Sequence, residues 1–475
     1  MRSSSWMSVA IWASIALGPL TQAASAGAAE IPKATIDNAA VLRDRALAGS
    51  EAYSILESLT TEIGPRPAGS EAQHRAAEWA MAKLKALGFS NVHSERFPVP
   101  GWTRGQETAE VTSPFPQRLI VTALGGSVAT PPAGIEAEVV LFPTYDAMLA
   151  QPVGALAGKI AIVTQPMPRT QDGSGYGANY MIRGQGATEA AKRGAVAYLL
   201  RSLATGDRRD AHTGTMHYAD GAPKIPAGAI SAPDAEQLDR MAARGKPIRL
   251  KLILTPTVRP NATAETVIGE IPGRERPEEI VLIGGHLDSW DLGTGAIDDG
   301  AGVAVTTAAA KLIADQPVRP RRTLRVALFG AEEIGKAADA YASAHLAEQD
   351  RHIIAAECDF GGEPVYRIEL PEKVSASPYG RALASVVSRV PTTVVPTPVQ
   401  DGGADLESLK GVPLAGLAQD GTHYFDLHHT ADDTLDKVSA KSLDKAVATW
   451  VAFAYLAADT DVDFRAISKS TSTAK

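Results

Sequence analysis

The second half of the chain alternates between short apolar runs and amphipathic stretches, and this alternation limits the folds that it can adopt. From about residue 265, four apolar runs have the character of buried strands, and they span 280–283, 324–329, 353–356 and 412–417. Helices are predicted at about 300–314, 336–348 and 439–458. Continuous apolar strands that alternate with helices are typical of a sheet covered on both faces. The pattern predicts an α/β fold, a three-layer sandwich with a mostly parallel central sheet.

The first half of the chain has a different character. Residues 36–90 have helical periodicity, and a strand is predicted at about 91–99. Short β-like runs then alternate with glycine and proline turns, which predicts an inserted β-rich domain at 104–258 with an exit linker at 258–262. The remaining predicted parts are a main α/β domain at 27–103 and 259–464 and a flexible tail at 465–475.

The first 26 residues have the features of a secretory signal. Arg2 precedes an apolar stretch at 6–20, and Ala24, Ser25 and Ala26 offer the small-residue pattern of a cleavage site. We expect the mature protein to be exported, to the periplasm or to the medium, and to have no membrane segment. An uncleaved N-terminal anchor is the alternative.

Charge and cysteine content argue against several classes of partner and fold. The chain has 46 Lys and Arg against 54 Asp and Glu, a net charge of −8 that is spread without long blocks. This balance argues against nucleic acid or an anionic membrane surface as the main partner. Cys358 is the only cysteine, so no disulfide can form within the chain.

Titratable residues follow each of the four predicted strands. They are His286 and Asp288 after the first, Glu332 and Glu333 after the second, Glu357 and Asp359 after the third, and His423, His428 and His429 after the fourth. Asp298 and Asp299 lie between the first two strands, at the expected start of a helix. Ligand sites of open α/β sheets lie beyond the carboxyl ends of the strands, so groups distant in sequence are predicted to meet there.

Each of these motifs alone has a simpler interpretation. Asp298 and Asp299 could cap the following helix, and the glutamate pair or the histidine pair could lie at the surface. Together, several carboxylates gathered at one sheet edge would repel one another unless cations were bound. Nitrogen and oxygen donors without a thiolate fit zinc, with cobalt or manganese as alternatives. A spare carboxylate would then accept a proton from a metal-activated water.

Four segments carry these residues in a characteristic order and spacing: HLDSWDLGTGAIDDGAG (286–302), FGAEEIG (329–335), ECD (357–359) and HHTADDT (428–434). The chain thereby resembles the di-zinc metallopeptidases of the M28 family, and within it the carboxypeptidase Q group, also called plasma glutamate carboxypeptidase. The resemblance covers about 36–100 and 260–460 and implies a phosphorylase/hydrolase-like zinc exopeptidase fold. The inserted region resembles a protease-associated domain, and we expect it to form a separate lobe over the metal crevice.

The resemblance implies a role for each matching residue. It makes Asp298 the carboxylate that bridges two zinc ions and Glu332 the general base, and the Asp298–Asp299 peptide bond is expected to be cis. Asp288 would hydrogen-bond the imidazole of the ligand His286 and fix its tautomer. The implied zinc ligands are His286, Asp298, Glu333, Asp359 and His429. Tyr424 and His428 are expected to contact substrate. Surface or packing roles are expected for His74, His93, His212, His217, His345 and His352.

The function implied by the resemblance is that of an exported exopeptidase with two Zn²⁺ per chain. It would hydrolyse dipeptides or short peptides with a free N-terminus, with Glu332 taking a proton from the zinc-bound water. A homodimer is also suggested. The alternatives are an aminopeptidase acting on longer peptides, a glutaminyl-cyclase-like lyase with one zinc, and a catalytically idle binding protein of the M28 fold.

Overall fold

The apolar runs of the second half form the centre of a five-stranded sheet. The structure is a computed structural model that describes residues 30–397 and 402–469, so the predicted secretory signal at 1–26 lies outside the described residues. The strands are β1 (Ser90–Thr103), β10 (Thr257–Ile271), β11 (Arg276–His286), β12 (Arg322–Phe329) and β13 (His352–Glu357), in the order β1-β10-β12-β11-β13. β11 pairs in parallel with both β12 and β13, whereas the pairs β1–β10 and β10–β12 are antiparallel. The α/β prediction is confirmed, and the sheet is mixed rather than mostly parallel.

A three-stranded sheet lies beyond β13. It comprises β14 (Val365–Pro371), β15 (Thr393–Thr397) and β16 (Gly416–Gln419), in the order β15-β14-β16. The strand predicted at 412–417 meets β13 only at a single parallel bridge, between Ala355 and Leu414, before β16 pairs antiparallel with β14. Pro413 accounts for the difference, because its ring nitrogen has no hydrogen to donate to a strand ladder.

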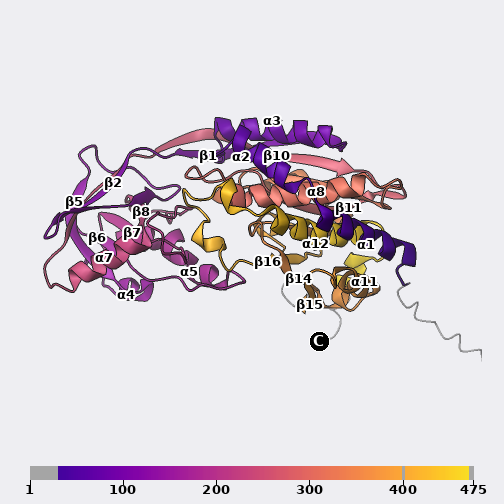
Figure 1. Cartoon of the computed structure of the whole chain (residues 1–475). Coiled ribbons are helices and arrows are strands. Elements are labelled where there is room, and N and C mark those ends of the chain that lie inside the picture. Colours follow the sequence, from indigo (N-terminus) through magenta and orange to yellow (C-terminus); the bar gives the residue numbers. More distant parts are fainter. Residues whose placement is uncertain (1–29, 398–401, 470–475) are drawn as a thin grey trace, which may run out of the picture.

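Helices cover both faces of the five-stranded sheet, because alternate residues of a strand point to opposite sides. One side carries α1 (Lys33–Ala48), α2 (Ala52–Glu62), α3 (Glu71–Ala86), α8 (Ala301–Ala314), α10 (Glu372–Ser375), α11 (Pro378–Val387) and α12 (Ala440–Ala458), and the other carries α9 (Ala337–Ala344). Val281 and Ile283 of β11 pack in the first core, and Ile280 and Leu282 pack in the second. Figure 1 shows α3 lying along β1 and β10. The predicted three layers are therefore present.

Residues 107–254 form a second sheet that shares no strand with the first in the described part of the chain. Its strands are β2 (Glu107–Ser113), β3 (Gln117–Leu119), β4 (Val121–Ala123), β5 (Ile135–Phe142), β6 (Ile160–Val163), β7 (Ala197–Arg201), β8 (Ala227–Ile230) and β9 (Arg249–Leu254), in the order β3-β2-β9-β5-β6-β7-β8-β4. It also has helices α4 (Tyr145–Leu149), α5 (Ser174–Gly184), α6 (Gly186–Lys192) and α7 (Ala232–Ala242). This inserted unit is therefore α/β in character, and Figure 1 shows it at one end of the molecule.

A long antiparallel ribbon joins the two units. β1 and β10 are paired from Ser90 and Glu270 to Thr103 and Thr257. The exit linker predicted at 258–262 therefore lies within β10, and that prediction is wrong. Pro260 fits into the strand because it falls at an irregularity in the pairing, opposite the shift between Val99 and Gly101, where no ladder hydrogen bond is needed from it.

The C-terminal segment begins with a helix rather than a flexible tail. Helix α13 (Phe464–Lys469) contains Arg465, whose guanidinium donates to the carbonyl oxygens of Gln349 (2.9 Å) and His352 (3.2 Å). The predicted tail is therefore wrong for 465–469, and 470–475 lie outside the described residues. Over 30–397 and 402–469, none of the helices combines the length and the apolar composition that a membrane span requires.

Candidate metal centre

The five predicted ligands converge beyond the carboxyl ends of β11, β12 and β13. His286 is the last residue of β11, Glu333 lies in the short 3₁₀ turn η2 (Glu332–Ile334) after β12, and Asp359 follows β13. Asp298 lies in the turn η1 (Ala296–Gly300) before α8, and His429 follows the 3₁₀ turn η5 (Tyr424–Asp426). The five residues come from five separate segments and meet at one edge of the sheet, as predicted.

The donor atoms of the five predicted ligands form two sets that share Asp298. His286 Nε2 lies 3.1 Å from Asp298 Oδ1 and 3.4 Å from Asp359 Oδ1. His429 Nε2 lies 3.1 Å from Asp298 Oδ2 and 3.0 Å from Glu333 Oε2. Each set therefore contains one imidazole, one carboxylate of its own and one oxygen of Asp298.

Asp298 and Asp299 have different tasks. The peptide bond between them is cis, as predicted. Asp299 Oδ1 accepts a hydrogen bond from the Gly302 amide at the start of α8 (2.8 Å), and Asp299 Oδ2 accepts one from the His286 amide (3.0 Å). The helix-capping interpretation therefore applies to Asp299, whereas Asp298 points into the ligand cluster.

The chemistry of this donor set fits bound cations. Asp298 Oδ2 and Glu333 Oε1 are buried and have no hydrogen-bond partner among the described residues. Burial raises the pKa values of Glu332, Glu333 and Asp359, and neighbouring carboxylates add to each shift against the attraction of His286 or His429. Buried carboxylates that lack donors are stabilised in their charged form when a metal ion neutralises them. Zinc accepts nitrogen and oxygen ligands of these types.

Glu332 and Asp288 lie beside the first ligand set. Glu332 Oε2 is 4.0 Å from His286 Nε2, and the Glu332 amide donates to Asp288 Oδ1 over 3.1 Å. The predicted bond from the Asp288 carboxylate to the His286 imidazole is corrected: Nδ1 is 3.7 Å from Oδ1 but 3.0 Å from the Asp288 carbonyl oxygen. The backbone of Asp288 therefore orients the imidazole, and its carboxylate orients the backbone of Glu332.

Arg66 supports the segment that carries His286 and Asp298, and sequence patterns did not indicate it. Among the described residues, the partners of this fully buried guanidinium are all backbone carbonyl oxygens, those of Gly64, Leu287, Thr294 and Gly295. Asp433 Oδ1 accepts hydrogen bonds from the amides of Ala296 and Ile297, both over 2.7 Å. Both ends of the turn before Asp298 are therefore held by buried charged side chains.

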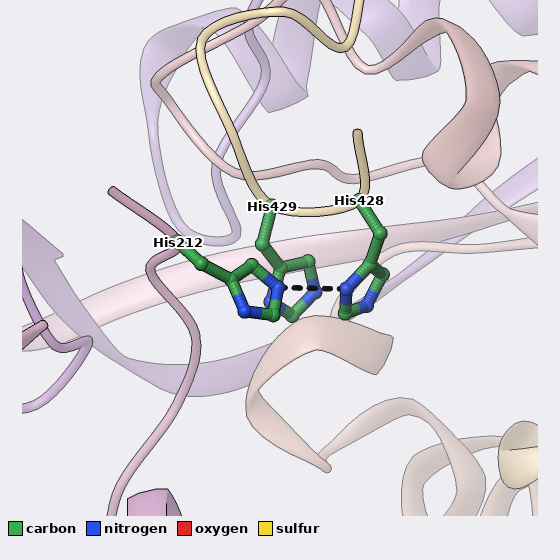
Figure 2. A group of neighbouring side chains, drawn as sticks. All are labelled: His212, His428 and His429. Atoms are coloured by element: carbon green, nitrogen blue, oxygen red, sulfur yellow. Dashed lines mark hydrogen bonds between the residues drawn. The ribbon is translucent and has the colours of Figure 1, made fainter. Parts of the chain in front are cut away.

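The inserted unit also contributes to the centre. Its residue His212 is buried, and its Nε2 lies 2.8 Å from His428 Nδ1, as Figure 2 shows. Of the two roles expected for His212, surface or packing, the surface role is excluded by its burial. Arg183 of α5 donates to the carbonyl oxygens of Thr215 (3.2 Å) and Thr213 (3.4 Å), and its Nη1 lies 3.3 Å from Nδ1 of the predicted ligand His429. Nothing in the sequence around either residue distinguishes it from an ordinary polar side chain.

A cavity of about 330 Å³ opens onto the ligand cluster. Its wall combines residues of both units: Tyr176, Tyr180, Arg183, Thr215 and His217 from the insert, and Asp298, Glu332, Glu333, Gly335, Asp359, Phe360, Tyr424, Phe425, His428 and His429 from the main unit. Tyr424 and His428, predicted to contact substrate, therefore lie in a position to do so. A cavity that joins titratable groups to aromatic side chains is typical of a small-molecule or peptide site.

Comparisons with known proteins agree with this geometry. The family model described as Peptidase family M28 matches residues 266–454. Carboxypeptidase Q of Mus musculus is 36% identical over 419 residues, which cover 87% of this chain and 86% of the relative, and the Homo sapiens protein is 34% identical over 413 residues, which cover 87% and 86%. The solved structure of a peptidase M28 precursor from Shewanella amazonensis is 45% identical, with a TM-score of 0.88 over 91% of this chain and 98% of that one. The chain belongs to the M28 family of peptidases and is a metallopeptidase.

Proposed function

We propose that this protein is a di-zinc exopeptidase that hydrolyses dipeptides and other short peptides with a free N-terminus. The observation that carries the proposal is the pair of ligand sets sharing Asp298, with Glu332 beside them. One zinc would be held by His286, Asp298 and Asp359, and the other by Asp298, Glu333 and His429. A catalytically idle protein of this fold would have lost ligands or the base, whereas all six groups are present in this chain.

The residues around the cluster divide the chemical work. When bound, zinc polarises a peptide carbonyl and acidifies water. Glu332 is not needed as a ligand, so its carboxylate is available to accept a proton from the attacking water and to deliver it to the leaving amine. Burial raises the pKa of Glu332, which favours a group that can hold a proton between these two steps. Asp288, through the Glu332 amide, keeps this carboxylate near the reacting atoms.

Two features of the cavity favour short substrates. The insert forms one of its walls, so an extended chain would meet α5. Arg183 lines the cavity, and its guanidinium lies over the rings of Tyr176 and Tyr180. Its Nε and Nη1 are held by the carbonyl oxygens of Thr215 and Thr213, but it has no carboxylate partner among the described residues. A guanidinium without a carboxylate partner is suited to bind one from a substrate. We therefore assign Arg183 to the C-terminal carboxylate of the substrate.

Metal content and substrate length test the proposal together. We expect the purified protein to contain two zinc ions per chain, and dialysis against a chelator to abolish hydrolysis that added zinc restores. Dipeptides should be cleaved faster than tripeptides, and both faster than N-acetylated dipeptides. One metal per chain would instead favour the lyase, and faster cleavage of longer peptides would favour the aminopeptidase alternative.

Replacing Arg183 should change the preference for a free carboxylate. For Arg183→Gln we expect kcat/KM on a dipeptide to fall by about 10- to 100-fold, the size of one lost charged hydrogen bond, with little change on the corresponding dipeptide amide. Arg240→Gln is the matched control, because Arg240 is exposed on α7 and its pair with Glu236 spans 3.9 Å. Equal losses on the acid and the amide would contradict the assigned role.

Export and dimer formation are separate parts of the proposal. We propose cleavage near Ala26 because of the small residues there, and a homodimer because of the resemblance to the carboxypeptidase Q group. N-terminal sequencing of the protein recovered from cells tests the first. Light scattering of the purified protein tests the second.

A further inference from the structure

Three histidines from two units of the fold lie together beside the metal centre. Figure 2 shows His212, from the insert, beside the adjacent pair His428 and His429. All three are buried, with His428 and His429 at 6% exposure and His212 at 1%. His429 belongs to the ligand set around Glu333, but His428 and His212 belong to neither ligand set. The close approach of His212 to His428 therefore needs a separate explanation.

The proton of the hydrogen bond between His212 and His428 can lie on either residue, and one of the two arrangements leaves a buried donor without an acceptor. Of two imidazole nitrogens 2.8 Å apart, one donates and the other accepts. If His428 Nδ1 donated, His212 Nε2 would have to accept, and the hydrogen of His212 would sit on Nδ1. That atom is buried without a hydrogen-bond partner in the described part of the chain. A buried donor without an acceptor costs about 1–3 kcal/mol.

The opposite placement satisfies both ends of the pair. If His212 Nε2 donates, His212 Nδ1 needs no acceptor, and His428 carries its hydrogen on Nε2. His428 Nε2 lies 3.5 Å from Asp298 Oδ2, so this hydrogen faces a carboxylate oxygen. In the other tautomer, the lone pair of Nε2 would face the lone pairs of that oxygen. Two independent observations therefore favour the same tautomer: His212 Nδ1 has no partner in the described part of the chain, and His428 Nε2 lies near a carboxylate oxygen.

We propose that His212 is a positioning residue that holds His428 with its hydrogen on Nε2, so that His428 presents a hydrogen-bond donor to the cavity. In this state His428 cannot give Nε2 to a metal, and the two adjacent histidines have separate tasks: His429 is a ligand and His428 a donor. Without metal, the nearest acceptor that the structure shows for this hydrogen is Asp298 Oδ2, at 3.5 Å. With Asp298 engaged by zinc, the acceptor would be the carbonyl oxygen of the bound peptide, which becomes more negative as water attacks. This last step rests on the proposed peptidase function.

The position of His212 is fixed from both units. Its amide donates to Ser202 Oγ over 2.9 Å within the insert. The next amide, that of Thr213, donates to the carbonyl oxygen of His429 over 3.0 Å. His429 has a positive φ of 60°, a conformation that a side chain such as histidine adopts at a cost. The segment with His212 thus helps to hold the strained backbone of the neighbouring ligand.

Two substitutions at position 212 separate positioning from packing. For His212→Leu we expect kcat on a dipeptide to fall by about 10- to 100-fold, somewhat less than the loss of a complete oxyanion donor, while KM changes by less than about threefold and both zinc ions remain. His212→Gln can place an amide N–H near the position of Nε2, so we expect it to recover most of kcat. His93→Leu is the control, because His93 lies on β1 with its side chain 40% exposed.

The tautomer itself can be observed without catalysis. With ¹⁵N-labelled histidine there are ten histidines to resolve, and His428→Asn identifies the signals of His428. In the zinc-loaded wild type we expect hydrogen on Nε2 and a bare Nδ1, and a mixture of tautomers in His212→Leu. Hydrogen on Nδ1 in the wild type, or equal kcat for His212→Leu and His212→Gln, would overturn the proposal. A wild type with the expected tautomer but no peptidase activity would instead contradict the proposed function alone.

Discussion

Glu332→Gln is expected to lower kcat on a dipeptide by about 10²–10⁴-fold, the contribution of a general base, while both zinc ions stay bound. The carboxylate lies near His286 and belongs to neither pair of close contacts around Asp298, so its loss removes a proton acceptor and no ligand. The amide of glutamine has nearly the same shape, so the backbone bond to Asp288 should persist. The measurement is kcat beside zinc content on the same preparation.

Glu333→Gln is the matched comparison, since the two residues are neighbours on one short turn. Glu333 Oε2 lies 3.0 Å from His429 Nε2, inside the second ligand set. We expect this variant to lose about one zinc per chain and to regain part of its activity in excess zinc. Excess zinc should restore nothing to Glu332→Gln. Metal loss in Glu332→Gln with metal retention in Glu333→Gln would show that the two roles are reversed.

Arg66→Met is expected to destabilise the protein by about 3–5 kcal/mol, because it removes a buried charged donor and leaves several buried carbonyl oxygens without partners. The affected oxygens belong to Gly64, Leu287, Thr294 and Gly295. Since this segment connects His286 to Asp298, zinc affinity should fall together with stability. The measurements are urea unfolding of the zinc-loaded and zinc-free protein and a zinc titration.

Two controls define what this result means. Arg240→Met removes an exposed arginine and should change the free energy of unfolding by less than about 0.5 kcal/mol. Arg66→Lys keeps the charge but cannot reach several carbonyl oxygens at once, so we expect it to recover only a minor part of the stability. A change of stability in Arg66→Met no larger than that of Arg240→Met would show that the segment is held in place by other contacts.

The ligand cluster could be predicted from the sequence because of a general property of parallel strands. Their carboxyl ends lie at one edge, so the residues that follow 280–283, 324–329 and 353–356 had to meet there once the strands were identified. The assignment of Glu333 as ligand and Glu332 as base came from the family resemblance. Spacing alone shows only that neighbours on an extended chain point in different directions.

The residues that the sequence did not reveal act across long separations. Arg66 is 221 positions from its acceptor Leu287, and His212 is 216 positions from His428. Neither lies in a periodic sequence pattern, because contacts between residues this far apart in the sequence depend on how helices, strands and loops pack in the folded protein. The strand at 412–417 was assigned to the wrong sheet for a local reason, because Pro413 has no N–H to donate. The segment 258–262 was interpreted as a linker because proline normally interrupts a strand.

The ribbon of β1 and β10 has a consequence for how such a protein can diversify. Thr103 and Thr257 are direct partners in it, so the inserted unit leaves and re-enters the main sheet at adjacent points, about 4.5–5.5 Å apart in an antiparallel pair. A module attached in this way can be exchanged, shortened or enlarged while the host sheet keeps its register. Every proposed zinc ligand lies in the host, whereas Tyr176, Arg183 and His212 lie in the module. The inserted unit, which supplies part of the cavity wall, can therefore be replaced in evolution or by protein engineering while the proposed zinc ligands stay in place.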